Sequence, residues 1–136
     1  MKWPSLTIYT DRLPDGVGGV AHGPLVLIRP QYRADEGIHQ HEYEHVWQWW
    51  VAGLASAVLL ALVDVRLAGL AIGVHPALYY LVRPYRLWAE VCAYRVQRQF
   101  PNASGVPLSL DGAAMRLMSP RYDLRLSVAQ ARALLQ

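Results

Sequence analysis

The segment His41-Glu42-Tyr43-Glu44-His45 carries residue types at a spacing that can bind a metal ion. In a helix with 3.6 residues per turn, His41 and His45 lie one above the other on one face, so both imidazoles can hold one Zn²⁺. Glu42 then projects beside the metal, where its carboxylate can activate water. Helices rich in His and Glu also spell this pattern by chance, so the motif alone leaves the metal site open.

A second segment, residues 85–99, offers a third ligand. Pro84 suits the first turn of a helix, because its missing N–H needs no partner there. Glu90 would lie in the middle of that helix among apolar neighbours, where an unpaired carboxylate is costly. Because a catalytic zinc takes three protein ligands and keeps one position open, we expect Glu90 to be the third ligand. The competing interpretation is a surface glutamate that pairs with Arg83 or Arg86.

Together the two segments resemble a known family. The HExxH motif at residues 41–45, followed by Glu90-x-x-Ala93-Tyr94, is similar to the gluzincin metallopeptidases. The resemblance is strongest to the small zinc peptidases of bacteria and phages, and it covers about residues 18–136. The long apolar stretch between the two motifs departs from those compact proteins.

The resemblance implies a set of roles. His41, His45 and Glu90 would bind Zn²⁺, and Glu42 would be the general base that activates a zinc-bound water for peptide-bond hydrolysis. The substrate would be a peptide or a protein. Tyr94 lies one turn beyond Glu90 on the same face, so it is a candidate to bond a ligand or to steady the oxyanion. Its alternative role is packing in the core.

Two other histidines have weaker claims to the site. His39 lies about 160° around the helix from His41, so the two make a poor shared ligand pair. His75 precedes Pro76 and is either a core histidine or a donor to the transition state.

The composition narrows the classes of partner. Hydrophobic residues make up 54% of the 136 residues and charged residues only 17%, against about a quarter in typical domains, which points to a membrane or a large apolar interface. The net charge is +3, but the arginines are scattered rather than gathered in a stripe, so we expect no nucleic-acid partner. Cys92 is the single cysteine, which excludes an internal disulfide.

The N-terminus reads as extended structure without a secretory leader. Residues 1–4 lack an apolar h-region, so we expect no cleaved signal peptide and a cytoplasmic or membrane-associated protein. Residues 6–10, 17–21 and 25–28 have strand composition and are separated by turn residues, which predicts a small antiparallel sheet before the metal motif.

Peptidases of the gluzincin type bind the extended substrate on the edge of such a sheet. Val26, Leu27 and Ile28 are our candidates for that edge strand, because main-chain pairing recognises peptides of many sequences. An ordinary sheet strand without a ligand role is the alternative.

Residues 46–82 form a long apolar segment. Val46 to Val63 spans 18 residues with Gln48 as its one strongly polar member, and residues 67–82 return after a short polar break. Eighteen apolar residues reach the lower bound for crossing a bilayer. Tryptophans open the first arm and aromatic residues close the second, so a helical hairpin would gather them at one level, as at a membrane interface. A buried or oligomeric helical pair is the other interpretation.

The C-terminal part predicts two short helices that pack on the metal-binding helices. Asp111 is the expected cap of a helix over residues 112–117, and Ser127 the cap of the last helix. The whole chain, residues 1–136, is then one α+β domain: a small N-terminal sheet, a mainly helical zincin-like core, and the apolar hairpin at residues 46–82 between the two zinc motifs.

Two functions of other classes stay open beside the peptidase. One is a non-catalytic, zinc-stabilised interaction protein, which a closed four-ligand site would favour. The other is a membrane hairpin protein in which the HExxH sequence is fortuitous, which an absence of zinc would favour.

Overall fold

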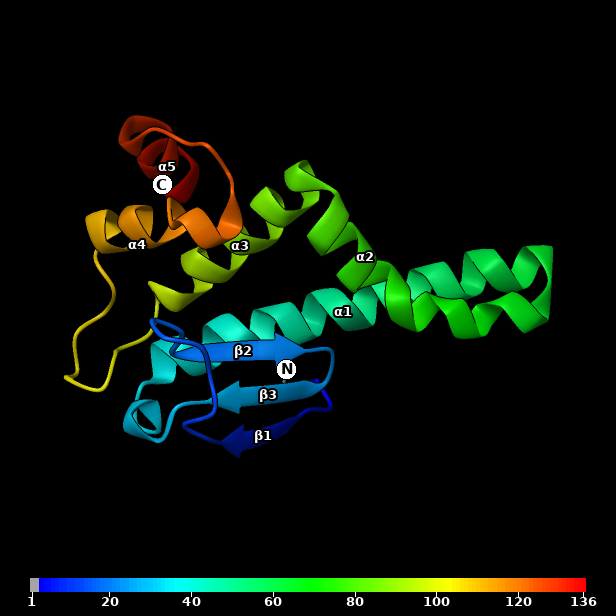
Figure 1. The fold of residues 1–136 in the computed structure, drawn as a ribbon, viewed down its shortest axis with the longest axis horizontal. Coiled ribbons are helices and arrows are strands. Elements are labelled where there is room, and N and C mark those ends of the chain that lie inside the picture. The colour runs from blue at the N-terminus through cyan, green and yellow to red at the C-terminus, as the bar shows by residue number, and fades with distance from the viewer. Residues whose placement is uncertain (1–2) are drawn as a thin grey trace.

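The computed structural model describes residues 3–136 and has the predicted α+β class. Figure 1 shows the small sheet lying along the first half of the longest helix, with the remaining helices on the other side of that helix. The strands are β1 (Leu6–Tyr9), β2 (Gly19–His22) and β3 (Leu25–Ile28). The α-helices are α1 (Glu36–Val63), α2 (Val74–Leu81), α3 (Arg83–Gln97), α4 (Leu110–Leu117) and α5 (Val128–Leu135). Three 3-10 segments are η1 (Pro30–Tyr32), η2 (Val65–Gly73) and η3 (Pro120–Tyr122).

The sheet is mixed, whereas we expected it to be wholly antiparallel. Its order is β1-β3-β2, with β3 parallel to β1 and antiparallel to β2. The connection from β1 crosses the sheet and delivers β2 to the far side of β3. Arg29 at the end of β3 holds this connection, because its guanidinium donates to the carbonyls of Val17 and Leu13 at 2.7 Å each.

This order corrects the predicted substrate-binding edge. Val26, Leu27 and Ile28 belong to the central strand, so their backbone groups face β1 on one side and β2 on the other. The side chains of Val26 and Ile28 are fully buried. The sequence showed three strands but not their order, and the strand at the edge beside α1 is β2.

Two hydrophobic clusters flank α1 and α3. One joins the sheet to α1 through Val26, Ile28, Ile38 and Val46. The other joins α3 to the C-terminal helices and includes Val91, Tyr94, Leu117, Leu124 and Leu135. The predicted metal ligands come from α1 and α3, so they lie between the two clusters.

The predicted hairpin at residues 46–82 is present, and it projects away from the rest of the molecule (Figure 1). Asp35 caps α1 by accepting from the Ile38 N–H at 2.8 Å, and the helix then runs for 28 residues. The return arm begins as the 3-10 segment η2 and becomes helical only at α2, so it is less regular than predicted. Trp49 joins the arms by donating to the Ile72 carbonyl at 3.2 Å.

The hairpin is apolar on its outside. Leu59 is 65% exposed, Leu62 80% and Leu70 65%. By length and composition α1 is long and apolar enough to cross a membrane, and only 11% of its most apolar 18-residue window is buried. A core helix of similar composition would be mostly buried, so this surface needs a different explanation.

The C-terminal helices differ from the prediction in one cap. Ser109, rather than Asp111, caps α4 by accepting from the Gly112 N–H at 3.0 Å, which leaves Asp111 within the first turn. Ser127 caps α5 as predicted and forms a reciprocal capping box with Gln130.

Candidate metal centre

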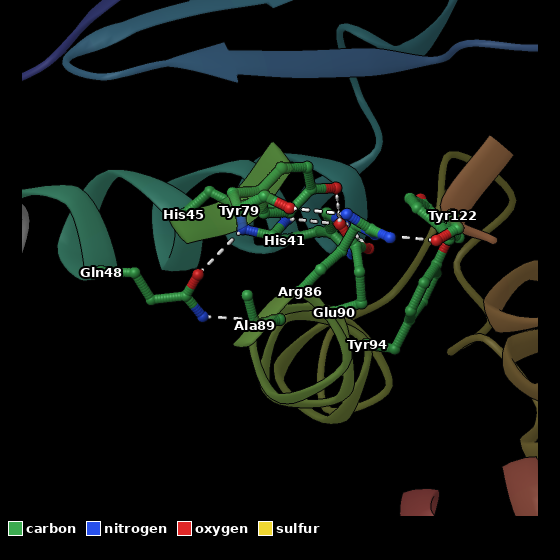
Figure 2. A network of polar contacts seen from close by, with 9 residues as sticks. All are labelled: His41, His45, Gln48, Tyr79, Arg86, Ala89, Glu90, Tyr94 and Tyr122. Atoms are coloured by element: carbon green, nitrogen blue, oxygen red, sulfur yellow. Dashed lines mark hydrogen bonds and ion pairs between the residues drawn. The ribbon is translucent and has the colours of Figure 1, made fainter. Parts of the chain in front are cut away.

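The structure brings His41, His45 and Glu90 together, so that three donor atoms converge between α1 and α3 (Figure 2). The Nε2 atom of His41 lies 3.7 Å from one oxygen of the Glu90 carboxylate. The Nε2 atom of His45 lies 3.5 Å from the other oxygen. The helical register alone aligns the two histidines, and the crossing of α3 over α1 supplies the carboxylate from 45 residues further along the chain.

The spacing and the burial fit a metal ion. Zinc–ligand distances of about 2.0–2.1 Å in a tetrahedral site place neighbouring ligand atoms about 3.4 Å apart, close to the two distances observed. Glu90 is 1% exposed, and one of its buried carboxylate oxygens has no hydrogen-bond donor among the described residues. Because an unsatisfied buried carboxylate oxygen is costly, a bound cation would supply the missing partner. The three residues can therefore hold a metal ion.

Gln48 orients His45, and we did not predict this role. Its side-chain oxygen lies 3.0 Å from His45 Nδ1, and its amide nitrogen donates to the Ala89 carbonyl at 3.1 Å. An amide oxygen only accepts, so His45 carries its proton on Nδ1 and keeps the Nε2 lone pair for a metal. Gln48 is 1% exposed, and the signal in the sequence was one amide in an otherwise apolar run, three residues after His45.

Tyr79 holds Glu90, and Arg86 holds the segments beside it, which are two roles that the sequence did not predict. The Tyr79 hydroxyl donates to the same Glu90 oxygen that faces His45. Arg86, one turn before Glu90 on α3, donates to the carbonyls of Tyr79 and Tyr122 at 2.8 Å each. The predicted alternative, an ion pair of Glu90 with Arg83 or Arg86, does not occur in the structure. Figure 2 shows Arg86 instead joining the two tyrosine segments beside the carboxylate.

Burial and charge set the protonation of the two central α1 side chains. Burial, followed by the nearby His45, holds the pKa of His41 well below its usual value, so this imidazole is neutral near pH 7. Burial raises the pKa of Glu42 to about 7, with the nearby His45 opposing this rise and the charge of Glu90 contributing to it. A carboxylate with a pKa near the working pH is well matched to accept and return a proton.

The edge strand β2 lies directly against Glu42. A side chain at Gly19 would place its Cβ only 2.9 Å from a Glu42 carboxylate oxygen, so a larger residue there would displace the Glu42 side chain. The backbone of Ala21 is close enough to lower the pKa of Glu42. Gly18 pairs inward with Arg29 through a 2.9 Å hydrogen bond. By the alternation of an antiparallel pair, the backbone groups of Gly19 and Ala21 therefore point outward, toward the site.

Tyr94 lies beside the metal centre, as the sequence analysis proposed, but its hydroxyl does not bond a ligand. Its ring packs edge-on against His41 at 4.5 Å between centroids, and its hydroxyl lies 3.0 Å from that of Tyr122. Burial raises the pKa of both phenols, and the charge of Glu90 raises them further. Both therefore stay protonated, and because one hydroxyl donates to the other, one of the two hydrogens is left for another acceptor. Tyr122 gave no signal in the sequence, because η3 is remote from both motifs.

Two cavities meet at Glu42. The larger, of about 760 Å³, follows β2 from Gly19 to Gly23 and is bordered by Trp49, His75 and Tyr79 at the base of the hairpin. The smaller, of about 240 Å³, extends the other way, toward α4 and η3. His41 and Glu42 line both cavities, so the metal centre is accessible along the edge strand from two sides.

His39 falls where its helical angle placed it, and His75 lies beside the site. His39 points away from the metal centre, because its ring bonds the Asp35 carbonyl at 2.7 Å and the Tyr9 hydroxyl at 3.1 Å. His75 lines the larger cavity, and its Nδ1 lies 2.7 Å from the Tyr85 hydroxyl.

No protein-family model, curated protein or solved structure matches this chain. The inference of function therefore depends on the metal centre itself and on the residues around it.

Proposed function

We propose that this protein is a zinc-dependent peptidase of the gluzincin type. One observation carries the proposal: His41, His45 and Glu90 converge at ligand distance beside Glu42, in a cavity that follows the free edge of a strand. Two imidazoles and one carboxylate are the ligand set of catalytic zinc in several peptidases, whereas structural zinc sites use four protein ligands. The larger cavity on this centre favours a site that is open to substrate over a closed structural one.

In this proposal zinc, when bound, lowers the pKa of water and polarises the carbonyl that is attacked. The chain supplies the remaining parts. Glu42 accepts the proton of the attacking water and returns it to the leaving amine, a role that suits its pKa near 7. Tyr122, which lines both cavities as a protonated phenol, is placed to donate to the developing oxyanion.

The substrate would bind as an added strand on β2, in place of the predicted β3. Gly19 and Ala21 present outward backbone groups next to Glu42, and such groups pair with any extended peptide. This arrangement predicts a peptidase that requires an extended substrate and has little dependence on most side chains.

The substitution Glu42→Gln tests the proposed chemistry. We expect the zinc-loaded variant to keep its zinc and to lose turnover of a fluorescence-quenched peptide mixture by about 10²- to 10⁴-fold, the usual contribution of a general base. The matched control is Glu44→Gln, which alters a half-buried carboxylate on the same helix outside both cavities near the metal. Full turnover in Glu42→Gln, or none in the zinc-loaded wild type, contradicts the proposal.

We further propose that the hairpin at residues 46–82 anchors this peptidase to a lipid bilayer. Its apolar side chains are exposed on both arms, and its base carries Trp49, Tyr79 and Tyr80, the residue types that favour the interface. The larger cavity borders the same aromatic base, so the site would open at the membrane surface. The substrates would then be polypeptide segments close to the bilayer.

A further inference from the structure

The smaller cavity beside the metal centre is bordered by an exposed arginine that has no partner among residues 3–136. Arg116 of α4 borders this cavity, together with polar groups of Gln97 and Ser119. Its side chain forms no hydrogen bond or ion pair with the rest of residues 3–136. Arg132, near the same end of the molecule, is by contrast paired with Asp111 at 3.3 Å.

The carboxylates that line the smaller cavity do not pair with its arginines. Arg121 also lines it, and within residues 3–136 its guanidinium donates only to the Asp15 carbonyl, at 3.4 Å. The acidic lining residues are Asp35 and Glu42. Asp35 is occupied as the cap of α1, and Glu42 lies against β2. The cavity therefore has two guanidinium groups and no carboxylate paired with either.

The charge of Arg116 lies close to the reacting groups. It lines the same 240 Å³ cavity as His41, Glu42 and Tyr94. A ligand that pairs with Arg116 would thus sit next to the metal centre.

The direction of β2 indicates which part of a bound peptide would enter the smaller cavity. The smaller cavity borders Gly16, Gly18 and Gly19, up to the start of β2. The larger also borders Val17 and the loop before it, but it alone continues along β2 to Gly23. A substrate that pairs antiparallel to β2, the slightly more stable arrangement, runs from the larger cavity to the smaller. Its residues C-terminal to the scissile bond therefore enter the smaller cavity, whose 240 Å³ admits only a short segment.

We infer that the smaller cavity is a carboxylate-binding subsite, in which Arg116 pairs with a substrate carboxylate just C-terminal to the scissile bond. This inference rests on the proposed function and specifies its substrate class. The carboxylate is either the C-terminus of a short substrate or an acidic side chain within a longer one, since a guanidinium binds both in the same bidentate way.

Binding to the zinc-loaded Glu42→Gln variant tests this inference without hydrolysis. One pair of probes is N-acetyl-tetraalanine as the free acid and as the C-terminal amide. The other pair is N-acetyl-Ala-Ala-Glu-Ala-amide and the same peptide with Gln in place of Glu. Isothermal titration calorimetry is expected to show about a fivefold to tenfold preference for the carboxylate member of one pair. The free acid being preferred identifies a terminal carboxylate, and the Glu peptide being preferred identifies a side chain.

Adding Arg116→Gln to that variant is expected to abolish the preference and to leave binding of the amide probes unchanged. Arg116→Lys is expected to keep part of it, because the charge remains without the planar fork. Arg95→Gln, which changes an exposed arginine of α3 outside both cavities near the metal, is the matched control. Equal binding within both pairs, or a preference that survives Arg116→Gln, overturns the inference. Turnover by the wild type is measured separately, so a failure of the peptidase proposal is distinguished from a failure of the subsite.

Discussion

The two halves of α1 have opposite surfaces. The first half, up to Gln48, buries His39, His41, Glu42 and Gln48. The second half exposes leucine and valine side chains, up to 80% at Leu62. Soluble domains usually do the reverse, burying apolar residues and exposing polar ones. The buried polar groups of the first half need hydrogen-bond or metal partners, and the exposed apolar groups of the second half need a surface that covers them.

The difference shows what each half is missing. In the first half, the side chains of His39 and Gln48 form hydrogen bonds with other residues of the chain. His41, His45 and Glu90 lie close enough together to bind one cation. In the second half, nothing among residues 3–136 covers the outer face of the hairpin. We interpret the first half as a catalytic centre and the second half as its attachment to a membrane.

Charges placed on the hairpin are expected to have the largest effect. Leu59 and Leu62 are three residues apart on one exposed face, and a charged residue within a bilayer costs about 3 kcal/mol. Leu59→Glu/Leu62→Glu should therefore lower binding to phosphatidylcholine vesicles more than a hundredfold in a co-sedimentation assay, with the melting temperature little changed. Val106→Glu/Met115→Glu alters two equally exposed apolar residues elsewhere and should bind like wild type. Equal vesicle binding by both double variants would show that the hairpin is not the anchor.

The buried half predicts a pH dependence of stability in the metal-free protein. The pKa of Glu42 is raised from 4.5 to about 7, so the folded state keeps a proton that the unfolded state has already released. The contribution of Glu42 to stability is therefore greatest below pH 4.5 and is lost as the pH rises to about 7, by up to about 3 kcal/mol. The buried His41, whose pKa is lowered, has the opposite pH dependence, so the test is the difference between two profiles. In urea unfolding with a chelator present, the stability of wild type relative to Glu42→Gln should fall as the pH rises from 4.5 to about 7.

The exposed Glu36→Gln substitution, at the start of the same helix, is the control for that comparison and should keep the wild-type profile. Parallel pH profiles for wild type and Glu42→Gln would show that burial does not perturb Glu42.

Gln48 should have a smaller effect, confined to metal affinity. Gln48→Leu removes the acceptor that fixes the ring of His45, and loss of such an outer partner usually weakens metal binding about 10- to 100-fold. A competition titration with a zinc-binding dye would measure this change. Gln40→Leu, which removes an exposed amide bonded to Glu36, is the matched control and should leave the affinity unchanged. An unchanged affinity in Gln48→Leu would mean that His45 needs no orienting partner.

The sequence predicted those parts of the molecule that depend on local spacing. The i, i+4 relation fixes His41 and His45 on one face, and the apolar surroundings of Glu90 indicated a buried carboxylate before its position was known. The apolar run and its polar break likewise indicated the hairpin. Each of these signals lies within a few turns of one helix, where geometry follows from sequence order.

The features that the sequence did not predict depend on contacts between segments that are distant in the chain. The strand order was not visible, because it depends on the path of residues 10–18 across the sheet and on Arg29, which holds that path. Tyr79 and Tyr122 reach the site only through tertiary packing. Arg116 lies on a helix to which we assigned no chemistry from the sequence, and only the structure shows that it lines the same cavity as His41 and Glu42.

The most direct test of the metal centre is the zinc content of the purified protein, measured by elemental analysis after loading and desalting. We expect about one zinc per chain in wild type and much less in His41→Ala and in Glu90→Ala. His39→Ala is the matched control, because it removes a buried histidine two residues away that bonds Tyr9 instead of the metal centre, and it should keep its zinc. Wild type without zinc, or zinc retained in full by His41→Ala and Glu90→Ala, would contradict the proposed site.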